Sequence, residues 1–273
     1  MQHFSADSLI LRAVDRGEND KLLTVLTAEH GRFYAILKGA HSLRRREAAA
    51  AEPFTWSNVE YYEKNGVKWV KTASALDSFP GIRYDMDKLF LAAYVADVAF
   101  ELSDERQPAG EILPLVLNTL YMLSVSKGEN ERIKAAFEMR AASIAGFRPE
   151  LGFCRRCGKS VAGDCYFDVM NGAPICLDCH GRDALTPLPL TDEFGERTVI
   201  LPMPAGTLAA VQYVSHAEDK RVFAFRLTDE KALAAFARAG EQYLLHHLER
   251  GFPTLENYKK LKAMKPSAPK KQE

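Results

Sequence analysis

The stretch that decides the organisation of this chain is Phe153–Arg182, which reads FCRRCGKSVAGDCYFDVMNGAPICLDCHGR. It contains two Cys-x-x-Cys pairs that are separated by 18 residues. Four thiolates at this spacing are typical of a tetrahedral zinc site with Zn–S bonds of about 2.3 Å and no open position for substrate. We therefore predict one structural Zn²⁺ in a segment spanning residues 150–183, with the ligands Cys154, Cys157, Cys176 and Cys179.

Other interpretations of the cysteines are weaker. A single Cys-x-x-Cys can be a redox motif, and disulfides would need an oxidising compartment, which nothing in the sequence indicates. Two matched pairs, each soon followed by a glycine, favour zinc. The fifth cysteine, Cys165, is expected to be a small core or surface residue. His180 could replace Cys179 as a ligand, but four thiols already suffice.

The overall composition is that of an ordinary globular protein of 273 residues, with 36 Lys and Arg against 36 Asp and Glu. Because the net charge is zero, any basic surface must be local. The N-terminus shows no signal-peptide pattern, and the longest apolar stretch, Leu89–Ala96, is far shorter than a membrane span. We expect a cytoplasmic protein that does not contact membranes.

The region up to Leu76 shows short apolar stretches separated by turn residues, with no helical period. Asn65-Gly66 is a pair that favours a type I′ hairpin turn. Five strands in so short a region predict an N-terminal OB-fold barrel over residues 1–79, a fold that often binds oligonucleotides. The expected strands are Leu9–Val14, Leu22–Thr27, Arg32–Lys38, Trp56–Glu63 and Lys68–Leu76.

The third expected strand alternates between an apolar face and a cationic face. Phe33, Ala35 and Leu37 form the apolar face. The opposite face and the loop that follows carry five Lys or Arg and no acid between Gly31 and Arg46. Cations beside an aromatic ring suit single-stranded nucleic acid, whereas a solvated strand beside a basic loop is equally consistent with the residues. The candidate nucleic-acid contacts are Arg32, Tyr34, Lys38, Arg44, Arg45 and Arg46.

From Tyr84 onward the apolar residues recur at three- and four-residue spacing, which predicts amphipathic helices with a shared core. We expect a helical domain over residues 80–258 that contains the zinc segment as an insertion, so the fold class is α+β with several domains. Asp85 and Asp87 could suggest a magnesium site, but acids in a first helical turn also complement the helix dipole. Residues 259–273, with six Lys and one Glu, are expected to form a disordered basic tail.

The order of barrel, helical body and four-cysteine insertion resembles the RecO family of recombination mediators. Local matches are Gly17-Glu18-Asn19-Asp20, Leu26-Thr27-Ala28-Glu29-His30-Gly31, Lys38-Gly39-Ala40, Pro53-Phe54 and Gly146-Phe147-Arg148-Pro149. The chain departs from the family pattern at His41, where many members have another basic residue, and at Gly251–Thr254.

This resemblance implies a protein of DNA repair and homologous recombination that works at the nucleoid and is not an enzyme. Members bind single- and double-stranded DNA and anneal complementary strands. With RecR they help to load RecA onto DNA coated with single-strand binding protein, whose acidic C-terminal tail they contact. The resemblance places DNA on the cationic face and loop defined above, and the pocket for the acidic tail on the helical body. Some members lack the cysteines, so zinc is expected to support the fold.

Two other functions remain open on the residues alone. A nuclease or other nucleic-acid enzyme would need a cluster of carboxylates for Mg²⁺, and the sequence contains no phosphate-binding loop or hydrolase motif. An RNA-binding zinc-ribbon protein would instead prefer RNA over a matched DNA strand.

Overall fold

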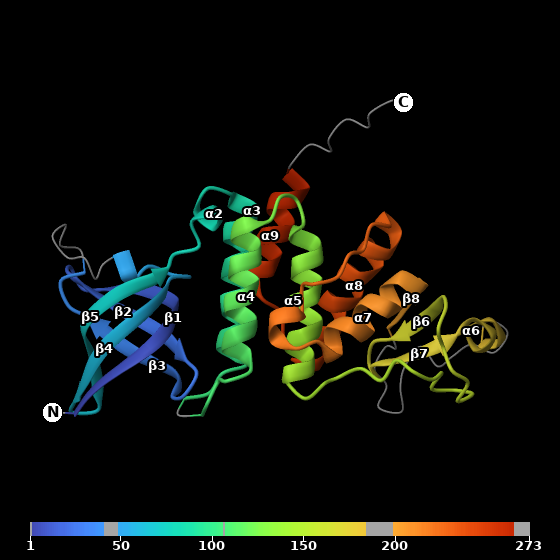
Figure 1. Ribbon diagram of the computed structural model, residues 1–273, viewed down its shortest axis with the longest axis horizontal. Helices are drawn as coiled ribbons and strands as arrows, with labels where there is room; N and C mark the ends of the chain where they lie inside the picture. Colours follow the sequence, from blue (N-terminus) through green and yellow to red (C-terminus); the bar gives the residue numbers. More distant parts are fainter. Residues whose placement is uncertain (1, 41–48, 106, 184–198, 265–273) are drawn as a thin grey trace. The chain divides into compact units, whose positions relative to one another are not determined.

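The computed structural model describes residues 2–40, 49–105, 107–183 and 199–264. These residues form two compact units (Figure 1). Unit 1 is Met1–Ser126 together with Gly251–Glu273, and unit 2 is Lys127–Arg250. The sequence predicts domains that end at residues 79 and 258. Whether these domains fold independently is a separate question from how the chain divides into compact units, so these boundaries stay a prediction.

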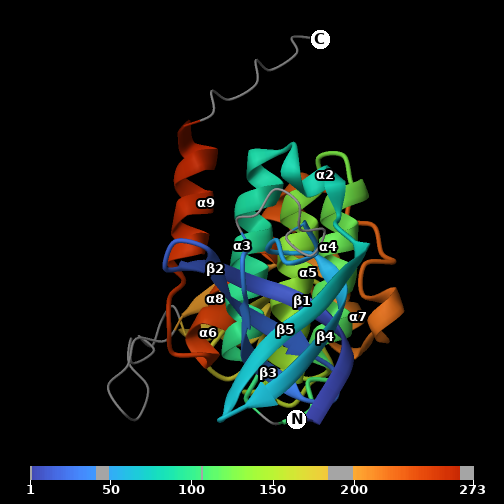
Figure 2. The ribbon, with the colours of Figure 1, turned by 90° about the vertical axis from the view of Figure 1, so that its left-hand side faces the viewer.

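Unit 1 begins with a closed barrel of five strands in the order β1-β2-β3-β5-β4, with β4 returning to β1 (Figure 2). Neighbouring strands are antiparallel except for β3 and β5, which pair in parallel. This confirms the predicted five-stranded OB-type barrel. The strands are β1 (Gln2–Arg16), β2 (Asp20–Thr27), β3 (Gly31–Leu37), β4 (Trp56–Lys64) and β5 (Val67–Asp77).

Strand β1 closes the barrel because it is long enough to pair on both sides. Its first half, Gln2–Leu9, pairs with β4, and its second half, Ser8–Arg16, pairs with β2. The register shifts between Ile10 and Arg12, and such a bulge bends a strand and increases its twist. The sequence predicted only Leu9–Val14, because the residues before Ser8 are mostly polar.

The barrel interior confirms the alternation predicted for the third strand. Phe33, Ala35 and Leu37 belong to the buried barrel core, while Tyr34 and Lys38 are exposed. Each of the other four strands also contributes to this core. The largest apolar residues that they contribute are Ile10, Leu23, Val25, Val59, Tyr61 and Val70. The turn between β4 and β5 has positive φ at both Asn65 (54°) and Gly66 (74°), as a type I′ hairpin requires.

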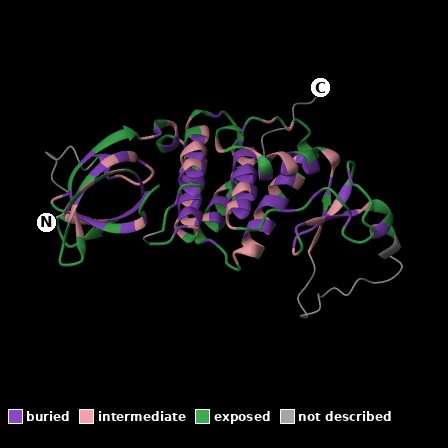
Figure 3. Ribbon diagram, turned by 60° about the horizontal axis from the view of Figure 1, so that its bottom comes forward, coloured by how far each residue is buried: buried purple, intermediate pink, exposed green. Residues whose placement is uncertain are grey.

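Four helices are assigned among the described residues of unit 1, of which three follow the barrel in the chain and the fourth comes after unit 2. They are α2 (Pro80–Arg83), α3 (Met86–Glu101), α4 (Ile112–Val125) and α9 (Pro253–Met264). Helix α3 packs against α4, α9 and β1, and α3 and α4 carry long buried faces (Figure 3). Asp85 caps α3 by accepting hydrogen bonds from the backbone N–H groups of Asp87 (2.9 Å) and Lys88 (3.3 Å). The interpretation of Asp85 and Asp87 as helix-start residues is therefore confirmed.

Helix α9 corrects the predicted start of the basic tail. The sequence places residues 259–264 in the tail, but the helix continues through them to Met264. Leu255 and Tyr258 are buried, and Lys259 pairs with Glu256 one turn earlier at 3.2 Å. Packing of these two side chains therefore extends the helix into the lysine-rich sequence. Residues 265–273 of the predicted tail lie outside the described residues.

The barrel is joined to α3 by two arginines that share one aromatic ring. The guanidinium carbons of Arg12 on β1 and Arg32 on β3 lie 4.4 Å and 3.6 Å from the centre of the Phe100 ring. Arg12 also pairs with Asp97 at 2.6 Å, and Asp97 accepts a hydrogen bond from Thr254 at 2.8 Å. Cation–π and charged contacts thus fix two barrel strands on one helix.

Unit 2 packs its two longest helices closely together. Helix α5 (Asn130–Ile144) lies against α8 (Glu230–His247), although the cysteine segment separates them in the sequence. At their crossing, a Cβ on Gly240 would lie 3.1 Å from the Ala135 carbonyl oxygen, so only a glycine allows this approach without a shift. The other elements are β6 (Cys165–Asp168), β7 (Ala173–Cys176), α6 (Leu177–Asp183), β8 (Ile200–Met203), α7 (Ala205–His216) and a 3₁₀ turn, Asp219–Arg221.

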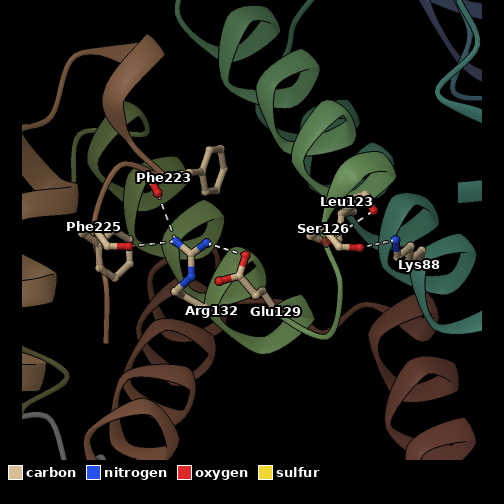
Figure 4. Close-up of polar contacts among 7 residues, drawn as sticks. All are labelled: Lys88, Leu123, Ser126, Glu129, Arg132, Phe223 and Phe225. Carbon is tan, nitrogen blue, oxygen red and sulfur yellow. Dashed lines mark hydrogen bonds and ion pairs between the residues drawn. The ribbon is translucent and has the colours of Figure 1, made fainter. Parts of the chain in front are cut away.

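Long cationic side chains donate hydrogen bonds to backbone carbonyls of residues outside the helices or at their ends (Figure 4). In unit 1, Lys88 donates to the Ser126 carbonyl at 2.7 Å, at the C-terminal end of α4. In unit 2, Arg132 donates to the carbonyls of Phe223 (3.0 Å) and Phe225 (3.2 Å) and to the carboxylate of Glu129 (3.0 Å). Among the described helices, none is both long and apolar enough to cross a membrane.

A buried charge network links α5 to α8. The Lys134 ammonium is 2% exposed and lies 2.9 Å from the fully buried Glu138 carboxylate and 2.7 Å from that of Glu241. Burial alone would lower the pKa of Lys134, but the two carboxylates raise it above its ordinary value. Lys134 therefore stays charged and compensates the buried carboxylate of Glu138.

We expect Lys134→Met to lower the free energy of unfolding by about 3 to 5 kcal/mol, because it leaves the Glu138 carboxylate buried without its cation. Urea unfolding followed by circular dichroism measures this change. The matched control is Lys259→Met, which removes an exposed pair within one helix and should change stability by no more than about 0.5 kcal/mol. Equal effects of the two variants would contradict the role given to the network.

Candidate metal centre and nucleic-acid surface

The four predicted ligand cysteines come together in unit 2. The sulfur atoms of Cys154, Cys157, Cys176 and Cys179 all lie within 4.8 Å of one another. The Cys157 and Cys176 sulfurs are 3.8 Å apart, which equals the separation of about 3.8 Å that a regular tetrahedron with Zn–S bonds of about 2.3 Å requires. The cluster could hold a metal ion, and its geometry fits a four-thiolate tetrahedral site.

The first cysteine pair, Cys154 and Cys157, lies in a tight loop after Phe153. The Cys154 N–H donates to the Lys159 carbonyl, and the Gly158 N–H donates back to the Cys154 carbonyl, both at 2.8 Å. Gly158 has φ of +69°, a left-handed conformation that a residue with a Cβ rarely adopts. The Gly after Cys-x-x-Cys is thus the residue that lets the chain reverse and bring both sulfurs to one side.

The second pair lies at the junction of a strand and a helix. Cys176 ends β7, and Cys179 lies in the first turn of α6. The Cys176 N–H donates to the Cys154 sulfur at 3.4 Å, which ties the two pairs together. The small sheet β7-β6-β8 supports this junction, with Phe167 and Ile175 fully buried.

The local environment favours a thiolate at Cys154. Burial opposes ionisation of this thiol, but backbone N–H groups of Cys176, Cys157 and Arg156 donate to the sulfur and lower its pKa to about 6. A thiolate is the form that binds metal ions. These backbone donors are therefore pre-arranged for a sulfur that carries negative charge.

The two other candidate ligands do not join the cluster. Cys165 is 3% exposed and pairs with Cys176 across the β6–β7 ladder, and burial raises its pKa to about 11, so it remains a neutral thiol. His180 instead stacks on Tyr166, with ring centres 3.5 Å apart and planes 7° from parallel. Cys165 is thus a core residue outside the cluster, which is one of the two positions, core or surface, that the sequence left open.

The described nucleic-acid candidates all lie on β3 or directly after it, but they differ in their surroundings. Tyr34 is 41% exposed, and Lys38 is exposed with its ammonium 4.6 Å from the centre of the Trp69 ring. Arg32 is half-buried against Phe100, and its Nε and Nη1 atoms have no hydrogen-bond partner among the described residues. Arg44, Arg45 and Arg46 lie outside the described residues.

One neighbour on β5, Trp69, extends this surface and was missing from the sequence-based set, whereas Lys68 lies on the opposite face. Trp69 pairs with Ile36, and Lys68 pairs with Ala35, in the parallel β3–β5 ladder. Trp69 therefore shares the outer face of the barrel with Tyr34 and Lys38. The sequence alone could not place Trp69 beside β3, because this position depends on the register between two strands that are far apart in sequence. We name the exposed side chains Tyr34 and Lys38, with the half-buried Trp69, the outer β3–β5 face.

Comparison with known proteins matches both regions of the chain to one family. Residues 1–79 match the family model described as recombination protein O N terminal, and residues 83–256 match recombination protein O C terminal. A DNA repair protein RecO from Acetivibrio thermocellus is 26% identical over 97% of this chain and 100% of its own length. One from Anaeromyxobacter sp. (strain K) is 35% identical over 77% of this chain and 78% of its own length. One from Pelotomaculum thermopropionicum is 32% identical over 66% of this chain and 69% of its own length.

We expect the wild-type chain to bind about one metal ion and Cys154→Ser to lose it, because three thiolates and a hydroxyl hold zinc more weakly than four thiolates. The same substitution should lower the melting temperature of the metal-bound protein, since metal binding contributes to folding. Metal content by mass spectrometry and thermal melting measure both effects. Cys165→Ser, at a cysteine outside the cluster, should keep the ion. Retention of metal by Cys154→Ser would overturn the ligand set.

Proposed function

This chain belongs to the RecO family of DNA repair and recombination proteins, and on that premise we propose that it is a non-enzymatic mediator that holds single-stranded DNA on its barrel. The observation that carries the proposal is the outer β3–β5 face. It places an exposed tyrosine and a lysine stacked on tryptophan side by side on one wall of an OB-type barrel. Cations follow phosphates and aromatic rings stack on bases, which is the chemistry of sequence-independent strand binding.

The proposed DNA contacts combine this face with the basic sequence that follows β3. They are Arg32, Tyr34, Lys38, Arg44, Arg45 and Arg46, to which the β3–β5 register adds Trp69. Arg32 differs from the rest because its guanidinium is held flat on Phe100. Its contribution is a cation at a fixed position, whereas Lys38 has a flexible chain and can follow a moving phosphate.

The proposed activity is the one that family membership supports. The chain binds single- and double-stranded DNA, anneals complementary strands and, with RecR, helps to load RecA onto DNA coated with single-strand binding protein. The acidic C-terminal tail of that protein docks on the helical body. These steps rearrange non-covalent contacts, and holding two strands near one another raises the rate of pairing without a catalytic group.

The proposed metal is a single structural Zn²⁺ bound by Cys154, Cys157, Cys176 and Cys179. Four soft thiolates with tetrahedral spacing favour zinc over harder divalent cations. With all four positions taken by protein sulfur, such an ion supplies no open site for water, so its contribution is to stability. Arg155 supports the same segment by pairing with the buried Asp168 at 2.8 Å.

A nuclease is disfavoured by the position of its candidate metal ligands. Asp85 uses one carboxylate oxygen to cap α3, so the Asp85–Asp87 pair is explained without a metal ion. Within the described residues, the only group of three or more His, Cys, Asp or Glu side chains with metal-binding spacing is the cysteine cluster. Cleavage by a Mg²⁺-dependent mechanism would require carboxylates grouped in this way.

We expect the triple variant Arg44→Ala, Arg45→Ala and Arg46→Ala to bind single-stranded DNA more weakly and with a smaller salt dependence. Each lost phosphate contact lowers the slope of log K against log salt by about 0.7, so the slope should fall by up to about 2. Fluorescence anisotropy titrations at several salt concentrations measure it. An unchanged slope would show that DNA does not contact these three arginines.

The matched control removes the same charge from exposed positions of unit 2, with the variant Lys220→Ala, Lys231→Ala and Arg238→Ala, and should keep the wild-type slope. Both variants are then compared in the annealing of complementary strands coated with single-strand binding protein. The wild type and the unit 2 control should accelerate annealing, and the arginine variant should do so less. Cleaved strands, or no acceleration by the wild type, would contradict the proposed function.

A further inference from the structure

One end of the barrel opens into a cavity because β3 and β5 pair over only two positions. The ladder joins Ala35 to Lys68 and Ile36 to Trp69, and the first three residues of β3, Gly31–Phe33, extend past the start of β5. The segment after α3 covers part of this gap, because the Arg32 N–H donates to the Asp104 carbonyl at 3.1 Å. A cavity of about 400 Å³ remains beside the rest of the gap, lined by residues of β1, β3, β4 and β5 and by both adjoining turns.

The cavity has an aromatic floor. The Phe4 ring stacks on the Tyr61 ring, with centres 5.1 Å apart and planes 15° from parallel, and Phe33 contacts Tyr61 at 4.8 Å. Phe33 and Tyr61 are buried in the barrel core, while Phe4 is half-buried at the edge. Burial and the nearby Glu63 raise the pKa of Tyr61, so its hydroxyl stays neutral. The floor therefore offers a neutral π surface to a planar ligand.

The rim of the cavity carries charges of both signs. Its basic members are His30, Arg32 and Lys68, and its acidic members are Glu29, Glu63 and Glu105. Lys68 lies 3.8 Å from Glu63 and 5.5 Å from the centre of the Phe33 ring. Arg32 is fixed by Phe100, as described above. A ligand that enters thus meets both hydrogen-bond donors and carboxylate acceptors around an aromatic surface.

We propose that this cavity receives a single unstacked nucleobase from a bound single strand. The inference rests on the proposed DNA-binding function and adds to it a defined site for one base. The base stacks against the rings of Phe4 and Tyr61, the carboxylates accept hydrogen bonds from its N–H groups, and Lys68 and Arg32 face its phosphate. A volume of about 400 Å³ lies within the range of about 300 to 1,000 Å³ that is usual for small-ligand sites.

The mixed rim argues against simpler ligands. A free phosphate or polyphosphate would meet three carboxylates together with the cations, and like charges at close range cost free energy. A purely apolar ligand would leave the same charged groups desolvated without partners. A nucleotide combines a planar ring, N–H donors and one anion, and so satisfies each part of the cavity.

The cavity is also continuous with the outer β3–β5 face, because Tyr34 belongs to both. A strand that follows Lys38 and Tyr34 along β3 reaches the gap where the β3–β5 ladder stops. A base turned inward at this point leaves the stack of its neighbours, and unstacked bases are the ones that proteins hold on aromatic side chains.

The test compares a labelled single strand with a strand of the same length that lacks all bases, so that both carry the same phosphates and only the first can fill the cavity. Anisotropy titrations of the wild-type chain should show about tenfold weaker binding of the abasic strand, the loss typical of base–aromatic stacking. Phe4→Ala should reduce this preference, with the part that comes from stacking on Tyr34 and Trp69 remaining, and should leave the affinity for the abasic strand unchanged. Tyr121→Ala, which removes an exposed aromatic ring from α4, should keep the preference.

A second variant covers the case in which Phe4→Ala does not fold. His30 is exposed on the β2–β3 turn and contacts Phe4 edge to face at 6.4 Å, so His30→Ala should fold normally and reduce the preference in part. An unchanged preference in the folded variants overturns the base site while the proposed function stands. Equal loss of affinity for both strands also overturns it, because that result indicates a charge or folding effect. Binding of neither strand by the wild type overturns both proposals.

Discussion

The contact on which unit 1 depends is the ring of Phe100 with two guanidinium groups on it. Arg12 comes from β1 and Arg32 from β3, and Asp97, one turn before Phe100, pairs with Arg12. Since β1 also closes the barrel between β2 and β4, fixing it on α3 fixes the barrel as a whole. Helix α3 thus covers the part of the barrel surface that carries Arg12 and Arg32. Binding of a polynucleotide is left to the outer β3–β5 face and the gap beside it.

Unit 2 is held together in a different way, because its sheet is too small to supply a large core. Strands β6, β7 and β8 have four residues each, and three strands of this length bury little apolar surface. The four-cysteine cluster provides a second source of stability, with backbone donors already directed at Cys154. Close packing of α5 on α8 at Gly240, together with the Lys134 network, joins the sequence on both sides of the insertion.

Features set by local sequence could be predicted, and features set by distant pairing could not. The Cys-x-x-Cys spacing, the alternation of Phe33, Ala35 and Leu37 and the Asn65-Gly66 turn each depend on neighbouring residues, and each was predicted. The polar first half of β1 becomes a strand only because β4 pairs with it, and α9 continues past Lys259 because Tyr258 is buried. The position of Lys68 at the cavity depends on the β3–β5 register, which no local pattern contains.

The central claim is that the barrel grips single-stranded DNA through β3 and β5 without altering it chemically. Hydrogen–deuterium exchange of the intact chain, with and without a single strand, tests this claim most directly, because bound DNA slows exchange where it covers or rigidifies the backbone. The account predicts added protection in residues 31–40 and 61–71, with the strand recovered intact. Protection confined to Lys127–Arg250, or recovery of a cleaved strand, would contradict it.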